Sequence, residues 1–182
     1  VIMSLYNTSF HNFITLSAIA DPLTINEDAG QQTVNLAGIS DGDTLAQIVS
    51  ITAVSSNPAL IPNPAVNYVD PNTTGTLTYT PVANQSGSAV VTVTARDDGD
   101  SAYVPNTLAR TFTVTVNAVN DAPQATNLSA NESYTEDTPL DLTDIVISDI
   151  DSSVATVMLT LSPASAGTLT TSTVGGSTSL YS

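Results

Sequence analysis

Hydrophobic and polar residues alternate along most of this chain. In the run 111–116, for example, Phe112, Val114 and Val116 are separated by threonines. A period of two places successive side chains on opposite faces of a β-strand, and β-branched threonine suits the half-exposed face. The alternation predicts strands at 33–36, 48–54, 65–69, 76–80, 91–95 and 111–116, and further along at 140–147 and 154–161.

Turn-forming pairs separate these runs. Proline or glycine follows an aspartate or asparagine at Asp21-Pro22, Asp41-Gly42, Asn57-Pro58, Asp70-Pro71 and Asp98-Gly99. Such pairs favour tight turns, and no stretch of useful length has the 3.6-residue period of an amphipathic helix. About seven short strands in about 105 residues is the pattern of an immunoglobulin-like β-sandwich, so the sequence predicts an all-β fold.

A pair of acidic segments occurs twice: Ile25–Asp28 with Ile39–Asp43, and Tyr134–Asp137 with Ile147–Asp151. Glu136 follows Glu27 by 109 residues. Asp149 follows Asp41 by 108 residues. A nearly constant offset of this size is the signature of tandem copies of one domain, so the chain is predicted to hold two sandwiches.

The offset divides the chain into three segments. Residues 14–120 are predicted to form the first sandwich, and residues 121–182 a second one that is incomplete, with only 62 residues. Residues 1–13 belong to neither copy. This extended segment is either an ordered leader or a donor strand that adds to a sheet edge in a neighbouring copy.

Charge excludes several classes of function. Seventeen acidic residues face only two basic ones, Arg96 and Arg110, which gives a net charge of −15. Binding to nucleic acid requires lysine and arginine and is almost excluded, and binding to an anionic membrane surface is disfavoured for the same reason. No apolar run approaches the roughly 20 residues of a membrane-spanning helix, and no membrane insertion is predicted.

Catalytic motifs are also lacking. The chain has one histidine, His11, and no cysteine, nucleophile elbow or phosphate-binding loop. Nucleophilic and phosphoryl-transfer chemistry depend on such groups, so the chain is predicted not to be an enzyme. Tryptophan is absent too, which weighs against a carbohydrate-binding module of the stacking type.

The motifs of both copies resemble the cadherin-like repeats of bacterial adhesins and other surface proteins. The resemblance covers residues 16–180 and is specific for the fold. It rests on Ala18–Asp21, Ile25–Gly30, Ile39–Asp43, Ser56–Pro62, Tyr79–Asn84 and Val119–Pro123 in the first copy, and on Thr135–Leu140 in the second.

The resemblance implies calcium at the junction between domains. Its glutamate near the domain start is matched by Glu27 and Glu136, and its early Asp-x-Asp by Asp41/Asp43 and Asp149/Asp151. Asp97 matches a late aspartate, and Asn120 and Asp121 match the linker. One junction site would then combine Glu27, Asp97, Asn120, Asp121, Asp149 and Asp151. Ala118 stands where the linker would carry an aspartate, and the Asp-Arg-Glu element is absent, which puts a full three-ion junction in doubt.

Two interpretations of these acids remain open. Calcium takes six to eight oxygen ligands, and a divalent cation would relieve the repulsion between gathered carboxylates. Aspartate and asparagine are equally suited to tight turns, because their side chains bond to nearby backbone groups. The sequence alone does not decide between a cation site and a set of turns.

These observations predict an extracellular or cell-surface module. Its role would be structural and adhesive: a semi-rigid rod or filament, stiffened by Ca²⁺ at the domain junction. Its partners would be neighbouring repeats or copies of itself, through strand exchange or filament assembly. The alternative is a recognition module that binds carbohydrate or protein through its loops.

Overall fold

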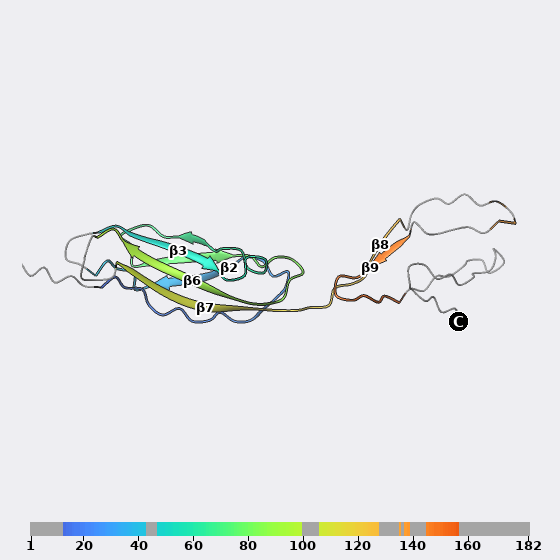
Figure 1. Cartoon of the computed structure of the whole chain (residues 1–182), viewed down its shortest axis with the longest axis horizontal. Helices are drawn as coiled ribbons and strands as arrows, with labels where there is room; N and C mark the ends of the chain where they lie inside the picture. Colours follow the sequence, from blue (N-terminus) through green and yellow to red (C-terminus); the bar gives the residue numbers. More distant parts are fainter. Residues whose placement is uncertain are drawn as a thin grey trace, which may run out of the picture. The chain divides into compact units, whose positions relative to one another are not determined.

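A computed structural model describes residues 13–42, 47–99, 106–127, 135, 137–138 and 145–156 (Figure 1). The chain divides into two units, Val1–Asn120 and Asp121–Ser182. Every regular element in the described residues is a strand. Unit 1 contains β1 (Ile25–Asn26), β2 (Gln32–Ala37), β3 (Val49–Ser55), β4 (Ala65–Asn67), β5 (Thr74–Tyr79), β6 (Gly87–Asp97) and β7 (Thr107–Asn117). Unit 2 contains β8 (Gln124–Thr126) and β9 (Val146–Ser148).

Unit 1 is a sandwich of two sheets. The first has the strand order β1-β7-β6-β3 and the second the order β2-β5-β4. All neighbours are antiparallel except β1, which pairs in parallel with the end of β7. An immunoglobulin-like sandwich divides its strands in this way, with β2, β5 and β4 in one sheet and β7, β6 and β3 in the other. The predicted all-β fold class is therefore confirmed.

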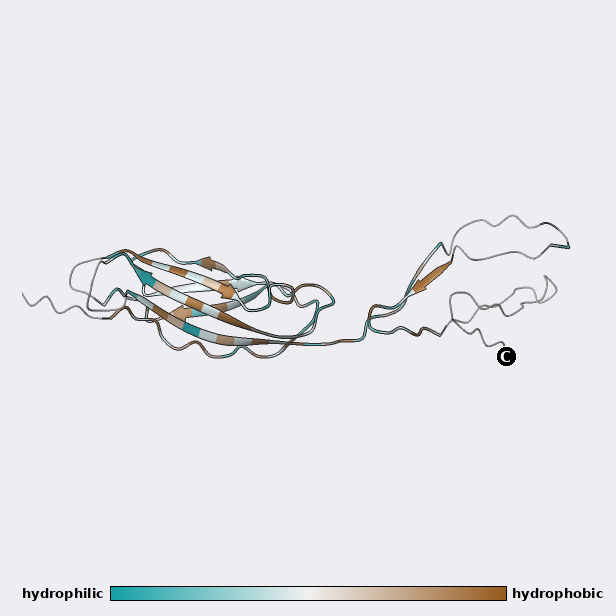
Figure 2. Ribbon diagram, viewed as in Figure 1, coloured by the Kyte–Doolittle hydropathy of each residue, from teal (hydrophilic) through white to brown (hydrophobic). Residues whose placement is uncertain are grey.

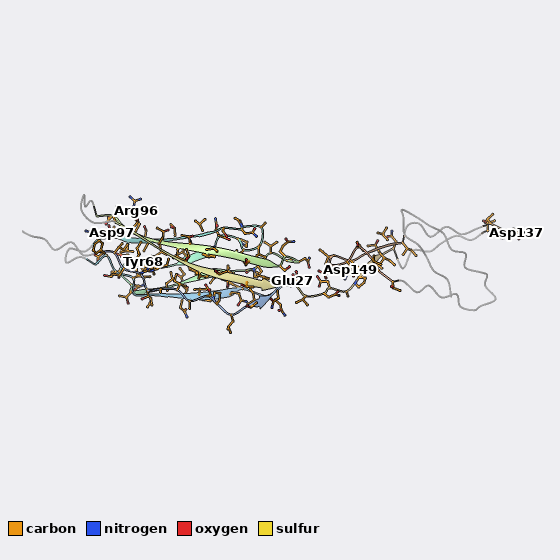
Figure 3. All side chains as sticks on the ribbon, turned by 60° about the horizontal axis from the view of Figure 1, so that its bottom comes forward. Glu27, Tyr68, Arg96, Asp97, Asp137 and Asp149 are labelled. Carbon is orange, nitrogen blue, oxygen red and sulfur yellow. The ribbon has the colours of Figure 1, made fainter. Side chains whose placement is uncertain are left out.

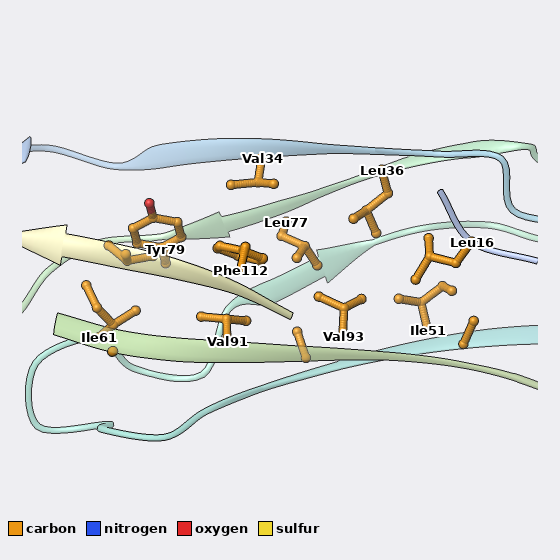
Figure 4. Packing of buried hydrophobic residues seen from close by; sticks show 14 of the residues in the cluster. Leu16, Val34, Leu36, Ile51, Ile61, Leu77, Tyr79, Val91, Val93 and Phe112 are labelled. Carbon is orange, nitrogen blue, oxygen red and sulfur yellow. The ribbon is translucent and has the colours of Figure 1, made fainter. Parts of the chain in front are cut away.

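The core lies between the inner faces of the two sheets. Every second residue of β6 is buried, and Val91, Val93 and Ala95 are completely inaccessible to solvent. Phe112 from β7 and Leu77 from β5 meet these side chains from the same sheet and from the opposite one (Figure 4). The alternation of hydropathy is visible along the long strands β6 and β7 in Figure 2. Burial of this apolar surface is the main force that holds the two sheets together.

The predicted strands agree with the structure better in position than in length. β6 and β7 each have 11 residues, whereas the alternation predicted only 91–95 and 111–116. Their outer ends pair in register, as in Ala95 with Leu108 and Gly87 with Val116, although the polar residues there break the alternation. Backbone pairing with a long neighbour therefore extends both strands beyond their hydrophobic runs.

The chain before β2 crosses from one sheet to the other. Thr15 exchanges backbone hydrogen bonds with Ser40, at 2.8 and 3.4 Å, beyond the end of β2. Ten residues later, Ile25 pairs with Val116 of β7 in the other sheet. The alternation did not predict β1, because a two-residue strand is too short to show a period.

In unit 2, the described strands form one two-stranded sheet. β8 pairs antiparallel with β9 through Gln124 with Ser148, Ala125 with Ile147 and Thr126 with Val146. β9 overlaps the end of the predicted strand 140–147 and extends one residue past it. β8 was not predicted. Residues 154–156 are not in a strand, and the rest of the predicted strand 154–161 lies outside the described residues. The segment 1–13 also lies outside them, except for Phe13. None of the described residues forms a helix with the length and hydrophobicity of a membrane span.

Candidate functional site

The predicted ligands of unit 1 lie at opposite ends of the sandwich. At one end of β6, Gly87 pairs with Val116 of β7. Val116 also pairs with Ile25 of β1, and Glu27 directly follows β1. At the other end of β6, Asp97 pairs with Val49. The 11 residues of β6 span roughly 30 Å or more at about 3.3–3.4 Å per residue. Figure 3 shows Glu27 and Asp97 at opposite ends of unit 1.

The prediction that Glu27 and Asp97 share one site is therefore wrong. The sequence places both residues next to strands, but it does not say at which end of the sandwich each strand begins. β6 runs away from the end at which β7 leaves unit 1, and it carries Asp97 with it.

Glu27 is a buried carboxylate at the end where β7 leaves the sandwich. Its side chain is only 7% exposed. Its backbone N–H donates to the carbonyl of Asn117 at 2.9 Å, and its Oε1 accepts from the N–H of Val119 at 2.6 Å. The side chain thus extends the parallel β1–β7 ladder by one bond after the backbone pairing stops. Asn120, the next predicted ligand, follows at once and is exposed.

A second contact closes the same end of unit 1. Asp28 accepts a hydrogen bond from the N–H of Asn84 at 3.0 Å through Oδ1. Both residues have left-handed backbones, with φ of 59° and 55°. Aspartate and asparagine adopt this conformation more readily than other non-glycine residues, because their short side chains bond locally. The turn after β1 is therefore tied to the loop before β6.

Asp41 and Asp97 lie at the opposite end, and each holds a nearby turn. Asp41 Oδ2 accepts from the N–H of Gln47 at 2.9 Å. Asp97 is 6% exposed, and its Oδ1 accepts from the N–H of Gly99 at 3.1 Å. The bond between Asp97 and Gly99 is a backbone-bonded turn, the alternative to a cation site that the sequence left open.

Two aspartates that the repeat motif did not single out lie at this end as well. Asp98 Oδ1 accepts from the N–H of Ile48 at 2.7 Å. Asp70 Oδ1 accepts from the N–H of Val49 at 3.1 Å and from the Tyr68 hydroxyl at 3.4 Å. Together they hold the start of β3 in place: Asp98 binds the residue before the strand, and Asp70 binds its first residue.

The phenol of Tyr68 lies near the carboxylates at this end of unit 1. Burial is the largest cause that raises the pKa of its phenol above the ordinary value. The charge of Asp70, the hydrogen bond to Asp70 and the charge of Asp41 raise the pKa further. Each cause disfavours the phenolate, because burial removes water and the carboxylates repel a second anion.

The predicted ligands of unit 2 come together in one turn. Asp149 Oδ1 accepts from the N–H groups of Asp151 and Ser152, both at 2.9 Å. Asp151 Oδ2 in turn accepts from the N–H of Asp121 at 2.5 Å. The turn after β9 is therefore closed by its own aspartates and bonded to the first residue of the unit. Asp121 and Asp149 are half-buried, and Asp151 is exposed.

The remaining predicted ligands, Asp43 and Glu136, lie outside the described residues. Within the described residues, no group of three or more histidines and acids is placed to hold a metal ion. Asp149 and Asp151, which lie in one turn, each use one carboxylate oxygen to accept a backbone N–H. Carboxylate oxygens match the preference of calcium, and each of these two carboxylates has a second oxygen.

Sequence reasoning missed a set of side chains that protect sheet edges. Asp21 Oδ1 accepts from the N–H of Thr113 at 2.6 Å, on the side of β7 that faces away from β6. Asn63 Oδ1 accepts from the N–H of Ser55 at 2.9 Å on the outer side of β3, where Asp70 bonds the other end of the strand. An open row of backbone N–H groups invites pairing with another chain, and these side chains occupy part of that row.

One sequence signal marks all three residues. Asp21, Asn63 and Asp70 each precede a proline. The residue before a proline is held in an extended conformation, which keeps it out of a helix or compact turn. A short polar side chain on such a residue can then reach the adjacent strand. Asp21-Pro22 and Asp70-Pro71 were interpreted as turn signals alone, and none of the three edge contacts could be predicted without knowing which strand lies beside the residue.

Comparison with known proteins identifies one family. The family model described as the bacterial Ig domain matches residues 15–117, from the Thr15–Ser40 bridge to the end of β7. No curated protein and no solved structure matches the chain.

Proposed function

This chain belongs to the bacterial Ig domain family, and we propose that it is a non-catalytic structural and adhesive module of an extracellular or cell-surface protein. In this proposal unit 1 carries mechanical load between neighbouring repeats, and unit 2 is a second copy of the same module. The partners are adjacent repeats or copies of the chain that meet end to end in a semi-rigid rod.

The observation that carries this proposal is the parallel pairing of β1 with β7. The chain enters unit 1 before β1 and leaves it after β7. Tension between these two points pulls β1 and β7 in opposite directions along their length. Ile25 with Val116 and Asn26 with Asn117 are then loaded together rather than one after the other.

Side-chain bonds reinforce the same contact on both sides of the short backbone ladder. Asp21 binds the N–H of Thr113 before it, and Glu27 binds the N–H of Val119 after it. The Arg110 guanidinium also donates through Nε to the carbonyl of Leu16 at 3.0 Å. The segment that precedes β2 is therefore fastened to β7 at two points, and to the residues just after β7 at a third, besides the two backbone pairs.

Force spectroscopy on the full chain, tethered at its two ends, tests the load-bearing role. Asp21→Ala is expected to lower the unfolding force of unit 1, because it removes one fastening between the first segment and β7. Asp70→Ala is the matched control, since it removes an equivalent bond on β3, which the tension does not load. Equal effects of the two variants on the unfolding force would contradict the proposal.

We also propose that Ca²⁺ stiffens the junction between the units. The residues that would hold it are Glu27 and Asn120 from unit 1 and Asp121, Asp149 and Asp151 from unit 2. Chain connectivity supports this set, because Glu27 binds Val119 and Asp151 binds Asp121, only two residues further along. The ion would neutralise carboxylates that repel each other and so favour one arrangement of the joint.

Calcium titration of the full chain by calorimetry and thermal melting tests this part separately. Ca²⁺ at about 1–10 mM, above the dissociation constants typical of extracellular modules, is expected to raise Tm, and a chelator is expected to reverse this increase. The double variant Asp149→Asn/Asp151→Asn is expected to lose the response, whereas Asp41→Asn, at the far end of unit 1, is expected to keep it. A chain without heat of binding and without a shift in Tm would rule out the calcium joint and leave the load-bearing proposal standing.

A further inference from the structure

A polar groove lies at the three-stranded sheet of unit 1. Its volume is about 470 Å³, and residues from β2, β4, β5 and the turn after β4 line it. This size lies within the range of small-molecule sites, roughly 300–1,000 Å³. The groove is distinct from the acidic turns described above, because none of the residues that line it, all within the described ranges, is acidic or basic.

Three asparagines supply most of the polar chemistry of the groove. Asn35 on β2 and Asn67 on β4 both pair with Thr76 on β5, so that the three side chains form one row across the sheet. Both asparagines are exposed, as is Asn72 in the turn that follows β4. With adjacent strands about 4.8 Å apart, the two ends of the row lie roughly 10 Å from each other.

These amides are not used to hold the fold. Among the described residues, the side chains of Asn35, Asn67 and Asn72 form no hydrogen bond with another part of the protein. Asn63 and the aspartates of the same unit do the opposite, because they accept backbone N–H groups at short range. Each groove amide therefore keeps two N–H donors and a carbonyl acceptor for another molecule.

Two aliphatic side chains border the amide row. Ala37 at the end of β2 and Val69 after β4 line the groove, and both are exposed. The side chains of Leu36 and Tyr68 pack on the other face of the sheet, against the core. A ligand in the groove would thus meet a small amount of aliphatic carbon beside the amide and hydroxyl groups.

We propose that this groove binds a neutral oligosaccharide. Hydroxyl-rich sugars both donate and accept hydrogen bonds, which uncharged amides match without any ion pair. Their ring carbons can pack against the exposed side chains of Ala37 and Val69. An anionic ligand would find no positive charge in the groove and would be repelled by a chain of net charge −15. The roughly 10 Å row of Asn35, Thr76 and Asn67 suits an extended chain of sugars rather than a single small solute.

The proposal goes beyond the load-bearing function and does not depend on it. It places recognition on a sheet face rather than on the loops at the ends of the sandwich. A surface module with such a groove could attach to a glycan with its side while its ends remain joined to neighbouring repeats.

NMR titration of the full chain tests the proposal. The probes are neutral hexasaccharides of glucose, galactose and mannose in different linkages, with hexagalacturonic acid as the anionic comparison. At least one neutral probe is expected to shift the backbone signals of Asn35, Asn67 and Thr76 and the side-chain amide signals of the two asparagines. Saturation at millimolar concentration is expected, because the contacts are few and the groove is open.

The double variant Asn35→Ala/Asn67→Ala is expected to weaken binding about tenfold or more, since it removes two amides that bond to the ligand. Asn117→Ala is the matched control, because this exposed strand asparagine lies on β7 in the other sheet. Backbone spectra of both variants show whether the fold is kept. The proposal is overturned if no neutral probe shifts the groove signals at 10 mM, if the double variant binds as tightly as the original chain, or if the anionic probe binds more tightly than the neutral ones.

Discussion

The two sheets of unit 1 contribute to the same core, yet their polar side chains have different tasks. Around the four-stranded sheet, Asp21, Asn63 and Asp70 are bonded to backbone N–H groups of the strands at its edges. On the three-stranded sheet, Asn35 and Asn67 point away from the core and bond to nothing else in the described residues. Residue type alone therefore does not distinguish a side chain that holds the fold from one that is free to bind a ligand.

The difference follows from where each side chain starts. Asp21, Asn63 and Asp70 leave loops that pass beside a strand with unpaired N–H groups, and a proline after each holds the backbone extended. Asn35 and Asn67 sit inside strands β2 and β4, each of which pairs with β5 on one side. Their side chains stand perpendicular to that sheet, where no backbone donor is in reach.

The largest expected effect concerns what the two sheets share. Phe112→Ala in the four-stranded sheet should lower the free energy of unfolding by about 3–5 kcal/mol, and Leu77→Ala in the three-stranded sheet by about 2–5 kcal/mol. Both side chains are almost fully buried, at 2% and 0% exposure, so either change leaves a cavity in the common core. Urea denaturation monitored by tyrosine fluorescence measures both values. A much smaller loss for Leu77→Ala would show that the three-stranded sheet is only loosely packed on its partner.

Removal of the buried carboxylate at the β1–β7 end should have the next largest effect. Glu27→Ala leaves the N–H of Val119 without its acceptor, and we expect a loss of about 1–3 kcal/mol in the free energy of unfolding. Glu27→Gln keeps an oxygen in place and should cost less. Urea denaturation of both variants at pH 7 makes the comparison, and equal losses would show that negative charge rather than the hydrogen bond is what matters.

The edge contacts should each contribute less to stability but more to solubility. Asp21→Ala and Asp70→Ala should each cost about 1 kcal/mol, while the corresponding asparagine variants, which keep Oδ1, should cost less. The exposed N–H groups of β7 or β3 should also increase self-association, measured by sedimentation velocity. If the alanine variants remain monomeric at the highest concentrations at which the original chain does, these side chains do not act as edge protection.

High pH should have a smaller effect on the free energy of unfolding, through tyrosines on or next to the three-stranded sheet. Burial and the charges of Asp70 and Asp41 raise the pKa of Tyr68, and burial raises the pKa of Tyr79. The unfolded chain therefore loses these protons first, and the free energy of unfolding should fall as the pH rises above about 10. Tyr68→Phe should make this fall shallower in urea titrations between pH 9 and 11. An unchanged slope would place the effect on Tyr79 or another group.

The smallest expected effect is on the groove of the three-stranded sheet. Asn35→Ala and Asn67→Ala should each change the free energy of unfolding by less than about 0.5 kcal/mol, because neither amide holds another part of the protein. The same urea measurement compares them with Asp21→Ala and Asp70→Ala. A loss of 1 kcal/mol or more from either asparagine would mean that it supports the fold, and the contrast between the sheets would disappear.

The fold class could be predicted because it depends on local patterns. Alternation in residues 111–116 and 91–95 gave the positions of β7 and β6, and the turn pairs gave the spacing typical of a sandwich. The ends of those strands and the two-residue β1 could not be predicted. They depend on backbone pairing with a neighbour that is distant in the sequence, which leaves no period to detect.

The candidate site was predicted residue by residue but not as an assembly. Asp149 and Asp151 do lie in one turn, because only one residue separates them, and Asp121 joins them through its N–H group. Glu27 and Asp97 were assigned to one junction and lie at opposite ends of β6. Motif matching gives the type of residue expected at a site, whereas strand direction decides which residues reach it.

By itself, the sequence determined that the chain folds as an all-β structure and that its surface is strongly negative. These properties follow from the period of two and from the count of charges. Only the tertiary structure decided which backbone N–H each carboxylate accepts and which asparagines have no partner within the described residues. Those outcomes depend on which strands lie side by side, and that arrangement is set by packing across the core between residues far apart in the chain.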